Sequence, residues 1–156
     1  MKITLLLVGK TTSADIKNIC ADYTKRINHY AKMEEVVIEN NAVKATDAQK
    51  VKEKEGELIL KKTAPGDFVI LLDDKGKEYT STQFAAYLEG LFNQSLKNIF
   101  FVVGGAYGFS DALYKRANAK LSLSKMTFSH QIVRAIFAEQ LYRAFTIMHN
   151  EPYHHQ

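Results

Sequence analysis

The chain has 156 residues, 46% of them hydrophobic and 24% charged, which excludes global disorder and corresponds to a single domain over residues 1–156. Its 21 Lys and Arg residues against 17 Asp and Glu residues give a net charge of +4, which permits contact with nucleic acid without requiring it. The apolar run 3–8 is too short to cross a membrane, no signal-peptide pattern follows it, and the single Cys20 forms no internal disulfide, so we expect a reduced, cytoplasmic setting.

The first third of the chain predicts two strands and two helices. The apolar run 3–8 is typical of a buried strand, and apolar side chains recur every three or four residues over 13–31, which predicts a helix. A second strand is predicted over 35–39. Thr46 with Gln49 three residues later has capping-box spacing, so we expect a helix there, with its many charges on a solvated face.

The middle of the chain adds a third strand and a third helix. A Pro-Gly turn leads into the wholly apolar run 68–72, which predicts a central, parallel strand. The polar residues 73–77 are expected to form a loop. Thr80 and Gln83 then form a second capping box in front of a clear helical stripe.

The last third predicts two further strands and two helices. A strand over 99–103 runs directly into a glycine-rich turn, after which Ser110 is expected to cap a short helix. Residues 121–123 are interpreted as a fifth strand, and a last helix is expected over 129–148. Strand and helix alternate throughout, so the predicted fold is α/β, with a mainly parallel sheet flanked by helices.

The last predicted helix is apolar around most of its circumference, more than one covering sheet requires. Either a second copy of the chain packs on it, giving a homodimer, or the helix is central in the monomer. It also carries Arg134 and Arg143, whose permanent charges predict a carboxylate or phosphate partner. Glu139 lies four residues before Arg143, so its carboxylate can be that partner in an ion pair within the helix.

Gly104 and Gly105 directly follow a predicted buried strand, where the ligands of open α/β sheets bind. Glycine there lets the backbone approach a ligand closely, although a plain tight turn explains the pair equally well. The segment is not a dinucleotide-binding fingerprint, and the chain holds no phosphate-binding loop of the nucleoside triphosphatases.

Two more segments carry candidate functional groups. Residues 121–128 alternate small hydroxyl and apolar side chains, which fits either a slot for an adenine ring or an edge strand followed by a helix cap. The tail 149–156 holds three of the five histidines but no cysteine, so no metal site is predicted. Pro152 and Tyr153 suggest a tail that docks on another surface rather than one that stays free.

Taken together, these segments resemble the ribosomal RNA large-subunit methyltransferase H family of the SPOUT class. The likeness spans the whole chain and is carried by Gly104-Gly105-x-x-Gly108, Leu121-Ser-Leu-Ser-x-Met-Thr127, His130 with Val133-Arg134, Ala138-Glu-Gln-Leu-Tyr-Arg143-Ala, and Pro152-Tyr-His154. The resemblance implies a transfer of methyl from S-adenosylmethionine to N3 of a pseudouridine in large-subunit rRNA, on the assembled ribosome. It also implies a homodimer and a C-terminal trefoil knot.

The resemblance also assigns residues. The cofactor would be held by Leu72, Gly104, Gly105, Leu123, Ser124, Lys125, Met126, Thr127 and Phe128. Arg143, Tyr153 and His154 are the candidates for positioning the substrate, with His154 a candidate base. Three departures stand out: Ala106-Tyr107 replaces a Pro-Glu pair, Ser129-His130-Gln131 replaces Pro-His-Pro, and His155-Gln156 replaces Arg-Glu. These leave a second hypothesis open, a non-catalytic ribosome- or RNA-binding factor with the same fold.

Overall fold

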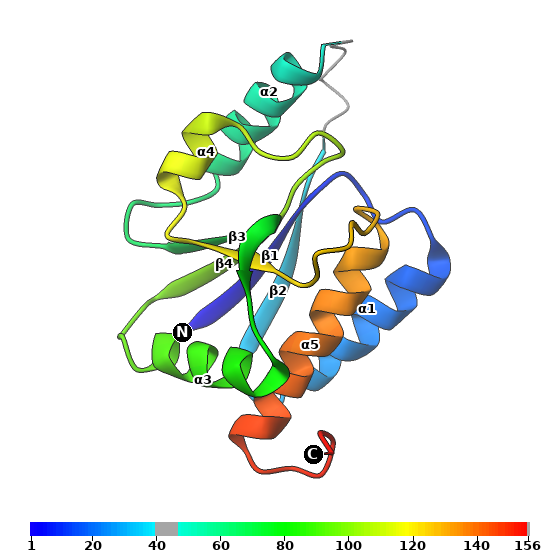
Figure 1. The fold of residues 1–156 in the computed structure, drawn as a ribbon, viewed down its shortest axis with the longest axis vertical. Coiled ribbons are helices and arrows are strands. Elements are labelled where there is room, and N and C mark those ends of the chain that lie inside the picture. Colours follow the sequence, from blue (N-terminus) through cyan, green and yellow to red (C-terminus); the bar gives the residue numbers. More distant parts are fainter. Residues whose placement is uncertain (40–46, 156) are drawn as a thin grey trace.

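The computed structural model describes residues 1–39 and 47–155, which form one five-stranded parallel sheet. The strands lie in the order β2-β1-β4-β3-β5 (Figure 1). Their bounds are β1 Lys2–Val8, β2 Lys32–Ile38, β3 Phe68–Glu78, β4 Asn98–Val103 and β5 Ala119–Ser122. This confirms the predicted α/β fold with a parallel sheet. The C-terminal trefoil knot stays a prediction.

Five helices cover the two faces of the sheet, with bounds α1 Ala14–Ile27, α2 Ala48–Leu60, α3 Ser81–Phe92, α4 Asp111–Arg116 and α5 Ile132–Met148. Helices α1, α3 and α5 pack on one face, and α2 and α4 on the other (Figure 1). None of the helices in the described ranges is long and apolar enough to cross a membrane.

The helix caps agree with the sequence at two of three predicted sites. Thr80 and Gln83 form the predicted capping box of α3, and Ser110 Oγ caps α4. In α2 the cap is Asp47, whose side chain accepts a hydrogen bond from the Gln49 N–H. The predicted cap Thr46 lies outside the described residues.

The predicted loop 73–77 is instead part of β3, which continues to Glu78 through a bulge. Leu72 and Lys77 are both in register with Leu121, so the residues between them project out of the ladder. Gly76 makes this possible, because a Cβ there would lie 2.6 Å from the Leu121 carbonyl carbon. The polar composition concealed the second part of a strand that leaves the ladder with β5 and returns to it.

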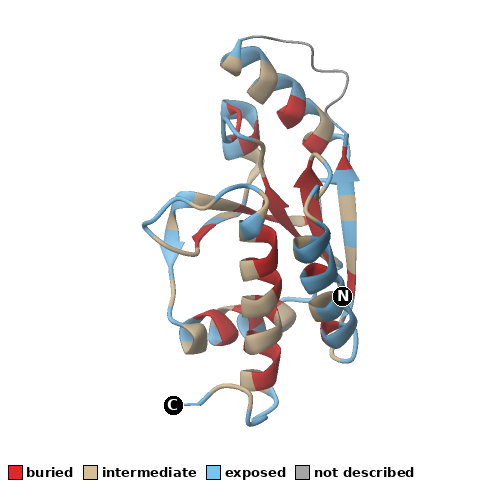
Figure 2. Cartoon of the chain, turned by 90° about the vertical axis from the view of Figure 1, so that its right-hand side faces the viewer, coloured by how far each residue is buried: buried red, intermediate tan, exposed pale blue. Residues whose placement is uncertain are grey.

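Helix α5 lies between α1 and α3 and presses its buried side chains onto the sheet (Figure 2). Phe137 packs against Phe101 with ring centroids 4.7 Å apart, and Phe145 stacks on Tyr30 at 5.5 Å. Most of the apolar circumference of α5 is therefore used inside one copy. Ile132, at its first turn, keeps 39% of its surface exposed.

Arg134 is fully buried at the start of α5 and binds three neutral oxygens. Its guanidinium donates to the carbonyl oxygens of Val8 at 2.9 Å and His130 at 2.8 Å, and to Thr11 Oγ1 at 2.8 Å. The expectation of a carboxylate or phosphate in contact with this residue was wrong, because backbone oxygens that the sequence pattern cannot reveal surround it. Burial lowers the pKa of Arg134, although the charge of Glu35 opposes that shift.

Gln131 adds hydrogen bonds between the start of α5 and the loop after β1, on the solvent side of Arg134. Its Oε1 accepts a hydrogen bond from the Thr12 N–H at 2.8 Å, and its Nε2 donates to the Lys10 carbonyl oxygen at 3.1 Å. We call Gln131 and Arg134, with their partners in residues 8–12, the N-terminal clasp. It fixes the chain just before α5 to the loop that follows β1.

Candidate functional site

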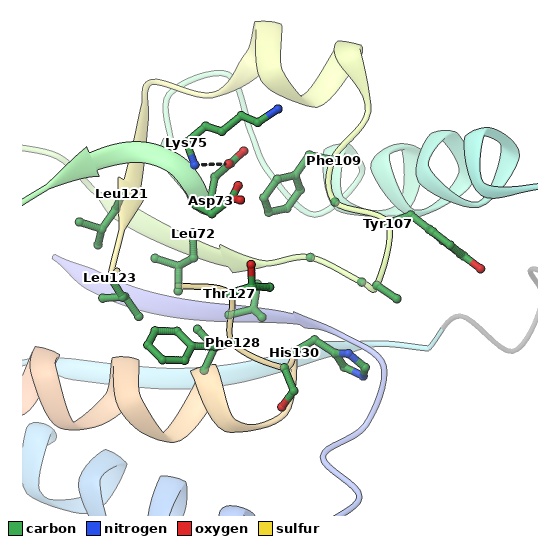
Figure 3. Close-up of a pocket in the computed structure, with 18 of the residues that line it drawn as sticks. Leu72, Asp73, Lys75, Tyr107, Phe109, Leu121, Leu123, Thr127, Phe128 and His130 are labelled. Carbon is green, nitrogen blue, oxygen red and sulfur yellow. Dashed lines mark hydrogen bonds between the residues drawn. The ribbon is translucent and has the colours of Figure 1, made fainter. Parts of the chain in front are cut away.

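A hollow of about 560 Å³ opens at the carboxyl ends of β3 and β4 (Figure 3). The glycine turn 104–108 forms one side, the loop 123–130 forms another, and Leu72 at the end of the regular part of β3 lies between them. The two segments singled out from the sequence therefore meet in one place. The volume falls within the range of small-molecule sites, about 300–1,000 Å³.

Most of the predicted cofactor-binding residues line this hollow. The lining includes Leu72, Gly104, Gly105, Leu123, Ser124, Met126, Thr127 and Phe128. Lys125 is the exception, since it is exposed and does not belong to the lining.

The loop 123–130, which we call the serine loop, is shaped by the hydroxyls of Ser124 and of Ser122 at the end of β5. Ser122 Oγ donates to the Ser124 carbonyl oxygen at 2.9 Å, and Ser124 Oγ accepts a hydrogen bond from the Met126 N–H at 2.9 Å. Met126 itself is 76% exposed at the rim. The loop thus brings apolar side chains, among them Leu123 and Phe128, and polar ones, among them Thr127 and His130, to the same hollow. An adenine slot combines an apolar surface with a few polar groups in this way.

The glycine turn is tightly packed, against Phe109, which lines the hollow, and against Glu55, which does not. The Gly108 N–H donates to the Gly105 carbonyl oxygen at 3.2 Å, and Gly108 has a φ of +80°. A Cβ on Gly104 would lie 2.8 Å from the ring of Phe109, and one on Gly105 would lie 2.6 Å from the carboxylate of the buried Glu55. A side chain at Gly104 would thus disturb the hollow by displacing Phe109, which lines it.

The predicted substrate-positioning residues lie together in a second place. Arg143 pairs with Glu139, as predicted, and Tyr153 Oη donates to Glu139 Oε1 at 3.0 Å. Tyr153 Oη also lies 3.2 Å from Tyr23 Oη, and His154 Nδ1 lies 3.3 Å from Arg143 Nη1. Burial, with the hydrogen bonds to Tyr23 and Glu139, raises the pKa of Tyr153. We call these five residues the tail cluster.

Within one copy the tail cluster and the hollow lie at opposite ends of α5 (Figure 1). His130 and Val133 line the hollow at the start of the helix, whereas Arg143 and His154 lie near its far end. At about 1.5 Å per residue, the helix separates the two by roughly 15–25 Å. The residues assigned from the sequence therefore fall into two groups that a single copy does not bring together.

The comparisons with known proteins identify the family. A family model described as a predicted SPOUT methyltransferase matches residues 1–154. The chain belongs to the SPOUT methyltransferase family. Among curated SPOUT relatives, a ribosomal RNA large subunit methyltransferase H from Parabacteroides distasonis is 54% identical over all of both chains. Proteins with the same name from Christiangramia forsetii and Flavobacterium psychrophilum are each 50% identical, again over all of both chains.

Two groups at the hollow of this SPOUT domain, on Asp73 and Tyr114, were not among the residues predicted from the sequence. Asp73 and Tyr114 both line it, and Tyr114 Oη donates to Asp73 Oδ2 at 2.5 Å. Asp73 directly follows Leu72, so its position at the carboxyl end of a predicted strand was a usable signal. Tyr114 lies on α4, 41 residues away, and no local pattern announces that contact.

Asp73 is held as an ionised acceptor. Its Oδ1 accepts a hydrogen bond from the Lys75 N–H at 2.8 Å, while Oδ2 is held by Tyr114. Burial raises the pKa of this carboxyl, but the hydrogen bonds from Tyr114 and Lys75, with smaller contributions from Asp74 and the charge of Lys120, outweigh it, so the pKa lies below its ordinary value. The same contact, added to burial, raises the pKa of Tyr114.

Proposed function

We propose that the chain transfers methyl groups from S-adenosylmethionine to N3 of a pseudouridine in large-subunit rRNA, on the assembled ribosome. One observation carries the proposal: the glycine turn and the serine loop of a SPOUT domain meet at one hollow at the carboxyl edge of the sheet. The names of the full-length relatives support the ribosomal substrate. Because ribosomes are the proposed substrate, we also propose a cytoplasmic location.

The residues of the hollow fit an adenosine-based methyl donor. Leu72 and Leu123 provide apolar walls for a flat ring, and the backbone of 124–128 provides the few polar groups that orient it. Gly104 has no side chain to displace Phe109 from its place in the lining, and Gly105 has none to displace Glu55 behind the turn. S-adenosylmethionine, when bound, supplies the electrophilic methyl group. The protein's task is to hold N3 about 3–3.5 Å from that carbon and in line with the sulfur.

We infer that the tail cluster positions the target nucleotide for a hollow in a second copy of the chain. In a two-fold dimer with antiparallel α5 helices, the far end of one helix lies beside the start of the other, so the tail of each copy reaches the hollow of its partner. Arg143 then faces the RNA phosphates, and His154 is the candidate base for the N3 proton. The exposed Ile132 supplies apolar surface for such an interface.

The activity is tested by transfer of a tritiated methyl group to ribosomes from a strain that lacks this methylation. Wild-type protein is expected to label the large-subunit rRNA at one pseudouridine. Removing residues 153–156 is expected to abolish labelling while calorimetry still detects binding of S-adenosylmethionine. Ribosome binding without any labelling by the wild type would favour the non-catalytic factor instead.

The dimer is tested by mixing two inactive variants, Gly104→Val and the protein lacking residues 153–156. If each tail serves the partner's hollow, random exchange makes about half of the dimers mixed, each with one intact site of two, so labelling returns at up to about a quarter of the wild-type level. If tail and hollow of the same copy work together, the mixture stays inactive. Light scattering of the wild type reports the oligomeric state directly.

A further inference from the structure

We propose that Asp73 is the acceptor for the ribose hydroxyls of the adenosine moiety, with Tyr114 as the residue that positions it. The inference rests on the proposed function and deepens it, because it assigns a contact to a side chain outside the glycine turn and the serine loop. Figure 3 shows Asp73 next to Leu72 at the rim of the hollow, with Phe109 on one side and Leu121 on the other.

The placement follows from the layout of an adenosine. Leu72 forms an apolar wall of the adenine slot, and the next residue of the strand carries the carboxylate. A ribose is bonded directly to its base, so its hydroxyls lie within a few ångströms of whatever contacts the ring. Successive side chains of a strand point to opposite faces, so Leu72 and Asp73 line different sides of the same hollow, with Asp73 on the side of α4. A base against Leu72 would direct its ribose toward that side, and carboxylates at the carboxyl edge of α/β sheets bind ribose hydroxyls in other nucleotide sites.

The chemistry of Asp73 suits two hydroxyl donors. An ionised carboxylate only accepts hydrogen bonds and offers about four lone-pair directions on its two oxygens. Lys75 N–H and Tyr114 Oη use one direction on each oxygen. Each oxygen retains acceptor capacity, which matches the two neighbouring hydroxyls of a ribose.

Asp73 is held in place by its neighbours, unlike an acidic side chain that only adds charge to the surface. Asp74, the neighbouring acid of the same bulge, is exposed, whereas Asp73 is partly buried between β3 and α4. Tyr114 reaches it from α4, and Lys120 Nζ lies 5.6 Å from the centre of the Tyr114 ring. A carboxylate fixed in advance loses little conformational freedom when a ligand binds, so its hydrogen bonds contribute more to affinity.

The test compares adenosine with 2′,3′-dideoxyadenosine, which keeps the base but lacks both hydroxyls. Binding is followed by NMR titration of the wild type, Asp73→Asn, Tyr114→Phe and the control Glu78→Gln, which removes the same charge from an exposed position of β3. Hydrogen bonds to a charged acceptor predict that the wild type prefers adenosine by at least about tenfold. Asp73→Asn reduces this preference to about threefold or less, Tyr114→Phe lowers it partly, and Glu78→Gln preserves it.

The outcomes separate this inference from the proposed function. A wild type that binds S-adenosylmethionine but does not distinguish the two nucleosides overturns the role of Asp73 and leaves the proposed function standing. If Asp73→Asn keeps the wild-type preference for adenosine over the dideoxynucleoside, the role of Asp73 is likewise overturned and the proposed function stands. A wild type that binds neither S-adenosylmethionine nor adenosine overturns both. Because each variant is judged by a ratio of two affinities, partial unfolding of a variant does not imitate the expected result.

Discussion

Replacing Gly76 by Ala tests the close approach of β3 and β5 that shapes the hollow. The added Cβ would lie 2.6–2.7 Å from backbone atoms of Leu121 and Lys120, and side-chain relaxation cannot relieve a contact with backbone. The strands must part by at least about 0.4 Å to bring the closest contact to 3.0 Å, and by about 0.8 Å to reach an ordinary contact at 3.4 Å. Overpacking of this kind costs about 2 kcal/mol, which for a domain of this size lowers the unfolding temperature by about 6 °C.

The matched control is Gly90→Ala on α3, where a Cβ meets nothing within 4 Å. It is expected to stabilise the helix by about 0.5–1 kcal/mol. Thermal unfolding measures both changes, and calorimetry with S-adenosylmethionine measures the second effect of Gly76→Ala, weaker binding, because Leu121 lines the hollow. A Gly76→Ala protein that unfolds at the wild-type temperature would refute the reasoning.

Three further predictions concern single side chains. Arg134→Met leaves the oxygens it binds buried and should lower the free energy of unfolding by about 3 kcal/mol in urea titrations; a loss below about 1 kcal/mol would contradict the role of the clasp. Tyr114→Phe should raise the lowered pKa of Asp73, as followed by NMR. The stability from this carboxylate is present above its unfolded pKa of about 3.9 and disappears as the pH falls through the lower folded pKa, so the variant should lose less stability on acidification; identical acid titrations would speak against the contact. Glu139→Gln weakens the partner of Arg143 and Tyr153 and should reduce methyl transfer by up to about 100-fold without changing the affinity for S-adenosylmethionine; an equal loss of cofactor affinity would show that the tail cluster acts on the hollow instead.

The parts of the fold that depend on local pattern could be read from the sequence. The apolar runs of β1 and β4 and the capping box at Thr80 need only near neighbours to be recognised, and the structure has them. The bulge of β3 was missed, because residues 73–77 are polar and their pairing partner, Leu121, lies more than 40 residues further along the chain. Periodicity carries no information about such pairings.

The candidate site also has parts that the sequence reveals and parts that it does not. Gly104 and Gly105 stand out because a buried strand ends directly before them. Their packing against Phe109 and Glu55, and the contact of Tyr114 with Asp73, are made by residues on other elements. Tertiary contacts of single side chains depend on how the helices are placed on the sheet, and one sequence alone does not specify that placement.

The N-terminal clasp has a consequence for the order in which the protein opens and closes. Residues 8–12 and 130–134 lie more than 115 positions apart along the chain, yet they share their hydrogen bonds, so neither can leave its place without the other. Amide hydrogens of the two segments should therefore exchange with solvent in one joint event, and a ligand seated beside His130 should slow exchange at Thr12 as well. Strand β1 is synthesised long before the segment at 130–134, so the clasp couples two parts of the chain that leave a translating ribosome at different times.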